Sequence, residues 1–417
     1  MKILWLSHLV PYPPKGGVLQ RSYNLIQQLS KYHQVDLLTF IQKTFLESLF
    51  PSFNAGMKES EEVLSSFCRK VQFVPIPVES KSLGKQALAL KSLFTRNPYS
   101  INWLISQEYQ KNLTRFMQES EYDLIHFDTI SLAPYRKFIG DALSVLDHHN
   151  IESHMMVRRA QKEKNMLLKL YYYQEGVRLK GYERINCPRF DLNITCSELD
   201  KLRLLEVHDK IHVAVIPNGV DLNYFSPIGK SELPDSLIFV GSMNWYPNVE
   251  AMHYFVKGVW PLLKKEVPKC ILHIVGANPP DSIRHYTSVD PAIQVHGYVD
   301  DVRPYIEQAS VYVCPIRDGG GTKLKLLDAF AMKKAVVAHP VSCEGIDVLP
   351  DRDVLFAETP SEFARKVLLL LRNTGLRQAL GENARLLVAQ KYSYDQIGNQ
   401  LSEAYIKLAD PRPEIVR

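Results

Sequence analysis

The sequence predicts an α/β protein made of two doubly wound domains. Short apolar segments rich in Val, Ile and Leu alternate with amphipathic helical patterns, which is typical of a parallel sheet covered by helices on both faces. The chain has 417 residues, and a single hydrophobic core usually stops growing near about 250 to 300 residues. The alternation also begins afresh after residue 225. Two domains are therefore expected.

The first domain opens with a strand–helix–strand unit. A strand at 2–7 precedes a loop rich in proline and glycine, a helix at about 18–32 and a strand at 35–40. Further buried strands are expected at 71–76, 124–127, 143–146 and 192–195. The domain is expected to span residues 1–224, and the C-terminal helix, 393–417, crosses back to complete it.

The second domain repeats the pattern over residues 232–392. Its expected strands are 237–241, 270–276, 293–297, 311–315 and 335–338. The segment 224–233 contains Pro227 and Gly229 and little apolar pattern, which is typical of a linker. Ligands of open α/β sheets bind at the carboxyl ends of the strands, so two such domains facing each other predict a site in the cleft between them.

Composition excludes several other classes of protein. With 46% hydrophobic and 23% charged residues, the chain is neither disordered nor a bundle of membrane spans. The six cysteines lie far apart without a CxxC pair, so they indicate reduced, cytosolic thiols rather than disulfides or a zinc site. The N-terminal apolar run is too short and too polar for a signal peptide. A cytoplasmic location is expected, with a peripheral place on the inner face of the cell membrane as an option.

The small positive charge is confined to the first half of the chain. Residues 1–225 contain 28 Lys and Arg against 23 Asp and Glu, whereas residues 226–417 contain 22 of each. Residues 81–115 hold six basic residues and one acid, and residues 158–189 hold nine and three, both interleaved with large apolar side chains. This mixture predicts docking on an anionic membrane surface or a lipid-linked acceptor. The alternative is a pair of ordinary amphipathic helices, and nucleic acid is a poorer partner.

A glycine-rich segment after the expected strand 311–315 indicates a phosphate site. Three consecutive glycines let the backbone approach a ligand, and the following helix start offers N–H groups to an anion, with Thr322 as N-cap. Lys325 and Asp328 share one face of that helix, where the carboxylate could accept two ligand hydroxyls. The alternatives are a flexible turn and a surface ion pair. Gly16 and Gly17 repeat the strand–glycine–helix arrangement in the first domain, without the GxGxxG spacing of a dinucleotide site.

Three further motifs have a chemical interpretation. His126 and Asp128 end a buried strand, where their side chains would face the cleft, although a satisfied core histidine is equally compatible. Residues 147–149, Asp-His-His, are either ligands and bases or a turn after a strand. Residues 351–353, Asp-Arg-Asp, have the form of a metal-binding DxD, but their proline-containing surroundings favour a solvated turn.

Together, these motifs resemble family-4 glycosyltransferases of the GT-B fold, whose two Rossmann-like domains face each other across a cleft. The likeness rests on the Gly16-Gly17 loop, VIPNGVD at 215–221, LIFVGSM at 237–243, ILHIVG at 271–276, VHGYVDDV at 295–302, GGGTKLKLLDAFAMKKAVV at 319–337 and the final YSYDQI segment. It extends from Met1 to about Leu408. Within this family, the sequence is most similar to bacterial sugar transferases for exopolysaccharide or cell-envelope glycans.

The resemblance implies retaining transfer of a sugar from a UDP- or GDP-sugar to a glycan or lipid-linked acceptor, the donor being bound mostly by the second domain. His126 or Asp128 would face the reacting sugar, and Asp328 would hold the ribose hydroxyls. The donor-binding residues implied are Gly16, Gly17, Gly241, Arg317, Gly319, Gly320, Gly321, Thr322, Lys323, Leu324, Lys325 and Asp328. The family usually has two glutamates eight positions apart, and here the second is Asp328 and the first is replaced by Gly320. The Arg and Lys usual after the first donor-domain strand are absent, so Lys323, Lys325 or Arg317 would substitute.

Fixed N–H dipoles and a lysine can stabilise a departing diphosphate without a metal, so neither metal nor cofactor is expected. A second hypothesis is a nucleotide-binding relative that lost transfer and serves in a glycan assembly complex, which the replacement by Gly320 motivates. A third, an NAD-dependent oxidoreductase, is disfavoured by the missing dinucleotide fingerprint.

Overall fold

The computed structural model describes residues 1–79, 84–318 and 321–410. These residues form two compact units: unit 1 comprises Met1–Pro217 and Ile397–Arg417, and unit 2 comprises Asn218–Gln396. The division lies before the expected boundary at 224. Val220 and Phe225 explain the difference, because both side chains are buried in the hydrophobic core of unit 2. The segment expected to be part of the first domain and a linker therefore begins the second unit.

Unit 1 contains a seven-stranded parallel sheet in the order β3-β2-β1-β4-β5-β6-β7. Its strands are β1 (Lys2–Ser7), β2 (Gln34–Ile41), β3 (Lys70–Pro75), β4 (Leu124–Phe127), β5 (Leu143–His148), β6 (Leu192–Thr195) and β7 (Val213–Val215). The helices of unit 1 are α1 (Gly17–Ser30), α2 (Lys43–Leu49), α3 (Phe53–Ser65), α4 (Gly84–Ser92), α5 (Tyr99–Asn102), α6 (Gln107–Glu119), α7 (Glu152–Lys162), α8 (Met166–Asn186), α9 (Glu198–Leu205) and most of α17 (Tyr394–Ala409), with 3₁₀ turns at Ile130–Phe138 and Cys187–Arg189.

Both faces of the unit 1 sheet are buried. Along β1, Ile3 and Trp5 belong to one hydrophobic cluster and Leu4 and Leu6 to another. Because successive side chains of a strand point to opposite faces, the two clusters lie on opposite sides of the sheet. This arrangement explains why the strands are continuous apolar runs rather than alternating ones.

The C-terminal helix α17 completes unit 1. Ile397, Leu401 and Tyr405 are fully buried in the same cluster as Ile3 and Trp5. These three positions are spaced by four residues, so they form one apolar stripe on the helix. Helix α17 is thus part of the core that β1 builds.

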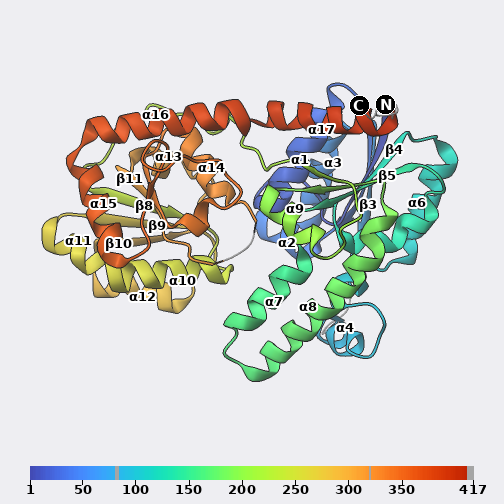
Figure 1. Ribbon diagram of the computed structural model, residues 1–417, viewed down its shortest axis with the longest axis horizontal. Helices are drawn as coiled ribbons and strands as arrows, with labels where there is room; N and C mark the ends of the chain where they lie inside the picture. The colour runs from blue at the N-terminus through green and yellow to red at the C-terminus, as the bar shows by residue number, and fades with distance from the viewer. Residues whose placement is uncertain (80–83, 319–320, 411–417) are drawn as a thin grey trace. The chain divides into compact units, whose positions relative to one another are not determined.

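Helices α7 and α8 form a hairpin that extends from unit 1 (Figure 1). Gly176 lets the two helices approach, since a Cβ added there would lie 2.8 Å from Val157 Cγ2 and 3.1 Å from the Val157 backbone nitrogen. The buried Glu183 carboxylate accepts hydrogen bonds from the Ser153 backbone N–H (3.1 Å) and hydroxyl (2.5 Å). Apolar packing and these buried hydrogen bonds hold α7 and α8 together.

Unit 2 contains a six-stranded parallel sheet in the order β10-β9-β8-β11-β12-β13. Its strands are β8 (Ser236–Val240), β9 (Ile271–Val275), β10 (Ile293–Gly297), β11 (Val311–Cys314), β12 (Val336–Ala338) and β13 (Leu355–Phe356). Its helices are α10 (Tyr246–Tyr254), α11 (Trp260–Glu266), α12 (Asp281–Val289), α13 (Arg303–Gln308), α14 (Leu324–Ala331), α15 (Pro360–Arg372) and α16 (Thr374–Lys391), with a π-helical turn at Phe255–Val259 and a 3₁₀ turn at Pro340–Cys343.

The expected fold class, two doubly wound α/β domains, is confirmed. Each expected strand exists within one or two residues of its expected bounds. The sequence analysis missed β7 and β13, which have three and two residues and lie at sheet edges, because such short edge strands carry almost no apolar pattern. All six cysteines are free and buried, as expected for structural thiols.

Both sheets have a topological switch point at which ligands of open α/β sheets bind. In unit 1 the chain winds outward in opposite directions from β1 and β4, and in unit 2 from β8 and β11. The loops after these strands hold most of the residues singled out from the sequence. The carboxyl ends of these strands are therefore the candidate functional sites of the two units.

Candidate functional site

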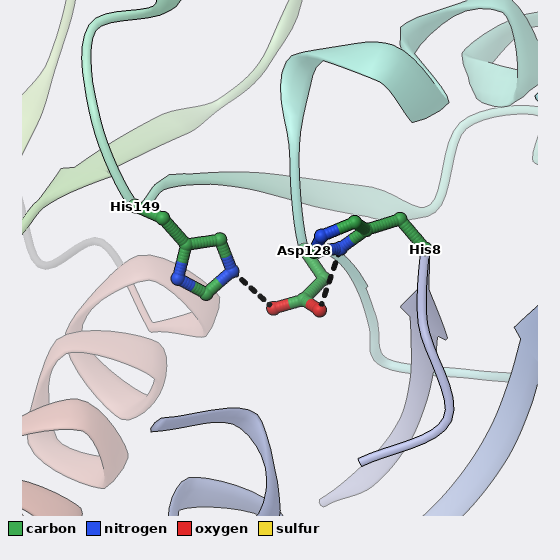
Figure 2. Close-up of side chains that lie close together, drawn as sticks. All are labelled: His8, Asp128 and His149. Carbon is green, nitrogen blue, oxygen red and sulfur yellow. Dashed lines mark hydrogen bonds and ion pairs between the residues drawn. The ribbon is translucent and has the colours of Figure 1, made fainter. Parts of the chain in front are cut away.

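In unit 1, three polar side chains meet where neighbouring strands end. His8 follows β1, Asp128 follows β4, and His149 follows β5, and these strands are adjacent in the sheet. Figure 2 shows the Asp128 carboxylate between the two imidazoles: His8 Nδ1 lies 3.2 Å from Oδ2, and His149 Nε2 lies 3.1 Å from Oδ1. Residues 120 positions apart in the sequence thus form one cluster.

The Asp128 carboxylate is held as an anion. Its oxygens also accept hydrogen bonds from the hydroxyls of Ser7 (2.9 Å) and Ser22 (3.0 Å). Burial opposes ionisation of this carboxyl, but His149 and His8 outweigh it and hold the pKa of Asp128 well below its ordinary value. Burial likewise works against the charged form of His149, but the carboxylates of Asp128 and Asp147 outweigh it and raise the His149 pKa.

His126 lies beside this cluster but within the core. Its ring has no exposed surface, stacks on Trp5 with 3.5 Å between ring centroids, and pairs through Nδ1 with the Tyr405 hydroxyl at 2.6 Å. Burial lowers its pKa to about 4, so the imidazole is neutral at pH 7. The carboxylate of Asp147, 3.9 Å from His126 Nε2, is bound in two places by the Arg21 guanidinium (3.0 and 3.2 Å).

The expectation that His126 or Asp128 faces the reacting sugar stays a prediction. Both side chains are fully buried, so neither presents exposed surface at the strand ends. His126 is a core histidine whose Nδ1 pairs with the Tyr405 hydroxyl and whose Nε2 has no hydrogen-bond partner among the described residues. Asp128 positions its two neighbours, His8 and His149. His8 and His149 keep small exposed fractions of their side chains, 11% and 8%.

The sequence contains a signal for both residues of the cluster that keep exposed surface. His149 is the last residue of the Asp-His-His motif at 147–149 and directly follows β5. His8 directly follows β1. The general rule that polar residues after parallel strands gather at one edge would have selected His8.

The contacts with Asp128 determine which nitrogen of the His8 and His149 imidazoles carries a proton. A carboxylate can only accept, so Asp128 faces the protonated nitrogens, His8 Nδ1 and His149 Nε2. The other nitrogens, His8 Nε2 and His149 Nδ1, can then accept a proton or a hydrogen bond when the rings are neutral. When a ring is protonated, the same nitrogen becomes a donor.

Two overlapping groups contain the ligand types of a metal centre. His8, Asp128 and His149 form one, and His126, Asp128 and Asp147 form the other, each with ligand atoms within 4.8 Å of one another. The Asp128 oxygens already accept hydrogen bonds from two hydroxyls and two imidazoles. In the second group, Arg21 already neutralises Asp147. The Asp128 and Asp147 carboxylates therefore already have hydrogen-bond or ion-pair partners within the protein.

In unit 2, two glycines without a Cβ allow other groups to approach the end of β8 closely. Gly241 follows β8 and Gly276 follows β9, and a Cβ on Gly276 would lie 1.9 Å from the Gly241 carbonyl oxygen. A Cβ on Gly241 would lie 2.3 Å from Lys325 Nζ and 2.9 Å from Asn248 Nδ2. Glycine at these positions brings the Lys325 ammonium against the strand end.

Lys325 projects from the first turn of α14 into partly buried surroundings. Its ammonium donates to Asn248 Oδ1 at 2.5 Å and lies 4.7 Å from the centre of the Phe239 ring. Burial lowers the Lys325 pKa to about 8. An ammonium with few polar partners is a strong site for an anion, because little solvation is lost when the anion arrives.

Asp328 stands one turn further along α14. Burial raises its pKa to about 8, and the nearby Lys325 only partly offsets that effect. Within the described chain, the carboxyl accepts no hydrogen bond. Leu324, Leu327 and Ala331 of the same helix are buried, so Lys325 and Asp328 occupy a separate face, in agreement with the expectation that they share one face. The pair could bind an anion and hydroxyl groups together.

The glycine-rich segment before α14 supplies further polar groups. Helix α14 begins at Leu324 with Lys323 as its N-cap, so the expectation of Thr322 as N-cap is wrong. The Thr322 hydroxyl is buried and has no hydrogen-bond partner among the described residues. Lys323 Nζ donates to the Gly321 carbonyl at 2.8 Å, and the Leu324 side chain belongs to the core, so only its backbone could meet a ligand. Gly319 and Gly320 lie outside the described residues.

Arg317 is less suited to the expected donor contact. Its guanidinium pairs with Glu250 and lies 4.0 Å from the Tyr254 ring centre. The adjacent Asp318 accepts a hydrogen bond from the Tyr246 hydroxyl at 2.7 Å. Lys325 is thus the better substitute for the basic residues that the resemblance leads one to expect.

Gly16 and Gly17 form the start of α1. Gly16 is the N-cap with φ of 108°, a conformation that favours glycine, and no side chain caps this helix end. A Cβ at Gly16 would meet no atom within 4 Å. The backbone there is open to a ligand, and its expected contact with donor phosphates stays a prediction.

The Asp-Arg-Asp motif at 351–353 is a turn rather than a metal site. Asp353 is fully buried and accepts hydrogen bonds from the Leu349 backbone (2.8 Å) and the Arg352 side chain (2.9 Å). Asp351 has φ of 60° and pairs with Lys366 at 3.0 Å. The two carboxylates are used in different structural contacts.

Comparison with known proteins finds a family match within unit 2. Residues 234–373 match the family model described as glycosyl transferases group 1. These residues include Gly241, Lys325, Asp328 and every described strand of the second sheet. Over 414 residues, the chain is 22% identical to an uncharacterized 44.6 kDa protein in the cps region of Klebsiella pneumoniae, covering 95% of this chain and 97% of that protein.

Solved structures show the same fold. Sucrose-phosphate synthase from Thermosynechococcus elongatus has a TM-score of 0.71 at 16% identity, with 98% of this chain and 99% of that chain covered. HepE from Anabaena, solved in complex with UDP, has a TM-score of 0.64 at 15% identity, with 98% of this chain and all of that chain covered. At this identity the likeness establishes the two-domain α/β fold.

Proposed function

We propose that this protein transfers a sugar from a UDP- or GDP-sugar to a saccharide or lipid-linked acceptor, and the match of residues 234–373 to the glycosyl transferases group 1 family model supports this proposal. The proposed reaction retains the configuration of the sugar, as the resemblance to family-4 enzymes implies, and serves polysaccharide or cell-envelope synthesis on the cytoplasmic side of the membrane. The HepE structures with UDP and with UDP-glucose support a uridine nucleotide as the first donor to test.

The observation that carries the proposal is the Lys325–Asp328 pair. An ammonium and a carboxyl, both shifted in pKa by burial, lie on one face of the helix that follows the glycine-rich loop. A nucleotide-diphosphate sugar offers the complementary groups, an anionic diphosphate for Lys325 and two ribose hydroxyls for Asp328. The unpartnered Thr322 hydroxyl is a further donor for a phosphate oxygen.

The same groups would assist bond cleavage. Leaving of the diphosphate concentrates negative charge on its oxygens while positive charge builds on the sugar ring. Lys325 and the N–H groups at the start of α14 are fixed before the reaction, so they stabilise that charge without reorganisation. This account needs no metal ion and no cofactor, and we propose a metal-independent hexosyl transfer.

Unit 1 would bind the acceptor. His8 and His149 are the polar groups of the strand-end cluster that retain exposed surface, and Asp128 fixes which nitrogens they present. In the neutral rings these nitrogens accept hydrogen bonds from hydroxyls, the groups in which a saccharide is rich. His8 and His149 replace His126 in this role.

The runner-up is a nucleotide-binding relative without transfer activity, acting in a glycan assembly complex. One sequence feature favours it: Gly320 stands where the resemblance leads one to expect an acidic side chain for the donor sugar. Such a protein would still bind the nucleotide through Lys325 and Asp328, so nucleotide binding alone does not separate the two proposals.

The test is a panel of UDP-, GDP- and ADP-sugars assayed for donor hydrolysis and transfer, together with calorimetric titration of the nucleotides. We expect one nucleotide to bind, and its sugar conjugate to be consumed. Binding without turnover of any conjugate would favour the runner-up. If no nucleotide binds to the folded protein, both proposals fail. Adding EDTA to an active reaction tests metal independence: activity that is lost and then restored by a divalent cation would contradict it.

A further inference from the structure

The tip of the α7–α8 hairpin exposes large apolar side chains that the proposed function does not use. Leu167 is 80% exposed, Met166 74% and Leu170 66%, at the start of α8. The exposed stripe continues along the helix at Tyr173 and Val177. Positions 166, 170, 173 and 177 follow the i, i+4, i+7, i+11 spacing of one helix face, over roughly 16 Å of helix.

A stripe with this spacing usually packs against a core, and here the core lies on the other side of the helix. Glu175, Gly176 and Leu179 are the buried residues of this part of α8. Gly176 packs against Val157 of α7. The Glu175 carboxylate accepts hydrogen bonds from the Tyr99 and Ser100 backbone N–H groups at 3.2 and 2.9 Å. The helix is therefore anchored on one face and unpartnered on the other.

The exposed charges around the stripe are predominantly positive. Lys162, Lys164 and Lys169 flank the tip, are exposed, and form no ion pair within the described chain. Of the three acids between residues 158 and 189, Glu175 and Glu183 are buried in hydrogen bonds of the hairpin frame. The third, Glu163, is partly buried and accepts a hydrogen bond from the Asn165 backbone at 2.9 Å. The exposed surface of the tip therefore has a higher ratio of basic to acidic side chains than the sequence of residues 158–189 as a whole.

We propose that the tip of the α7–α8 hairpin, residues 162–177, docks on an anionic lipid bilayer. Apolar side chains on one helix face enter the headgroup region, and the flanking lysines meet anionic headgroups. Among the described helices, none is long and apolar enough to cross a bilayer, so the contact is interfacial. The exposed lysines of this surface carry the charge that complements anionic lipids, and they lie beside its exposed apolar side chains.

The stretch 81–115, which the sequence analysis also assigned to this contact, is less suited. Leu88, Leu93 and Trp103 are partly buried, whereas Leu90 and Phe94 are exposed but do not continue one helix stripe. Lys85 pairs with Glu79, and Arg115 contacts Gln72 and Glu119. Lys81 lies outside the described residues. The proposal therefore rests on the hairpin tip alone.

The test is flotation of the full-length protein with vesicles of phosphatidylcholine alone or with one third phosphatidylglycerol, at low and high salt. We expect recovery with the anionic vesicles at low salt, and at least fivefold less with neutral vesicles or in high salt. The double variant Leu167→Glu/Leu170→Glu should lose at least nine-tenths of this binding. A variant with Lys162, Lys164 and Lys169 changed to Gln should lose the dependence on anionic lipid.

The matched controls are Leu202→Glu in α9 and Leu386→Glu in α16, which change leucines of similar exposure, 58% and 56%, outside the tip. Both should bind vesicles as the unchanged protein does. Equal binding by the double variant and the controls would overturn the proposal. So would salt-insensitive absence of binding, or a loss of self-association by the double variant without any vesicle binding, which would assign the tip to a second copy of the chain. Nucleotide-sugar hydrolysis in solution should be the same in all these variants, so failure here is distinguishable from failure of the proposed function.

Discussion

Asp128 is the residue on which the unit 1 cluster depends. It is fully buried, accepts hydrogen bonds from Ser7 and Ser22, and joins His8 to His149. Its negative charge is the main reason that the His149 pKa is raised despite burial. A change at Asp128 should therefore be visible in the titration of a neighbour rather than in the loss of a direct substrate contact.

We predict that Asp128→Asn lowers the pKa of His149 and reduces kcat/KM. The amide keeps the shape but loses the charge, so the raised pKa falls as the carboxylate is removed. The free energy of unfolding should drop by about 2 to 4 kcal/mol, because buried donors lose a charged acceptor. The measurements are an NMR titration of His149 and the pH profile of kcat/KM.

Asp191→Asn is a suitable control for this variant. Asp191 accepts hydrogen bonds from the Ser144 backbone (2.8 Å) and hydroxyl (2.7 Å) at the opposite end of β5. That variant should change stability without shifting the His149 titration. If Asp128→Asn leaves the titration unchanged in a folded protein, Asp128 has no positioning role.

The Lys325–Asp328 pair predicts a bell-shaped pH dependence of donor affinity. Asp328 accepts ribose hydroxyls best as a carboxylate, and its pKa of about 8 means that this form grows as pH rises from 6 to 8. Lys325 binds diphosphate as an ammonium, and its pKa of about 8 means that the charge is lost above that pH. The affinity for UDP-glucose, measured by calorimetry from pH 6 to 9, should be greatest near pH 8.

Single variants separate the two limbs of this profile. Asp328→Asn should remove the acid limb and weaken binding by about 2 to 4 kcal/mol at pH 8. Lys325→Met should remove the alkaline limb and weaken UDP more than uridine. Asp351→Asn, in the turn at 351–353, should leave the profile unchanged. A flat profile for the unchanged protein would contradict the assignment of both residues.

At the scale of elements, the α7–α8 hairpin contains a buried acid with a shifted pKa. Burial raises the pKa of Glu183 to about 7, and its hydrogen bonds from Ser153 only partly oppose the shift. A folded-state pKa above the unfolded value of about 4.3 means that the folded state binds more protons between the two values. The contribution of Glu183 to stability is full below pH 4 and is lost as pH rises through 7.

We predict that Glu183→Gln makes the hairpin less sensitive to pH. The glutamine stays neutral, so the variant should lack the loss of about 2 kcal/mol that Glu183 causes between pH 5 and pH 8. Denaturant unfolding at both pH values measures this difference for the two proteins. An identical pH dependence in both would show that Glu183 does not titrate in this range.

At the scale of the whole molecule, unit 1 is discontinuous in sequence. Its core needs Ile397, Leu401 and Tyr405 from α17, and the Tyr405 hydroxyl pairs with His126. Truncating the chain after residue 396 exposes the apolar surface that these three side chains cover. Each large buried side chain contributes about 2 to 4 kcal/mol, so unit 1 should be severely destabilised.

We predict that this truncation abolishes transfer but preserves nucleotide binding by unit 2. Unit 2 comprises Asn218–Gln396 and holds its own sheet, core and Lys325–Asp328 pair. Hydrogen exchange should show loss of protection in β1 and β4 and unchanged protection in β8 and β11. Loss of protection throughout would indicate that the two units do not fold separately.

The sequence by itself determined the fold class, nearly all strands and the placement of Lys325 and Asp328 on one helix face. Apolar runs of four to eight residues specify buried parallel strands, and the helical spacing of Leu324, Leu327 and Ala331 fixes the face on which Lys325 and Asp328 lie. These are local properties, because a pattern within one element decides which side of it is buried.

Only the tertiary structure decided which polar residues of unit 1 keep access to a ligand. His126, Asp128 and His149 all lie at strand ends, and sequence position alone ranks them equally. The stacking of Trp5 on His126 and the Tyr405 hydroxyl from the far end of the chain bury one of them. The predominantly basic surface of the hairpin tip likewise depends on the burial of Glu175 and Glu183, which only the tertiary structure shows. The burial of a side chain depends on all the segments that pack around it, including segments distant in sequence. It is therefore decided by tertiary packing and not by the local sequence pattern.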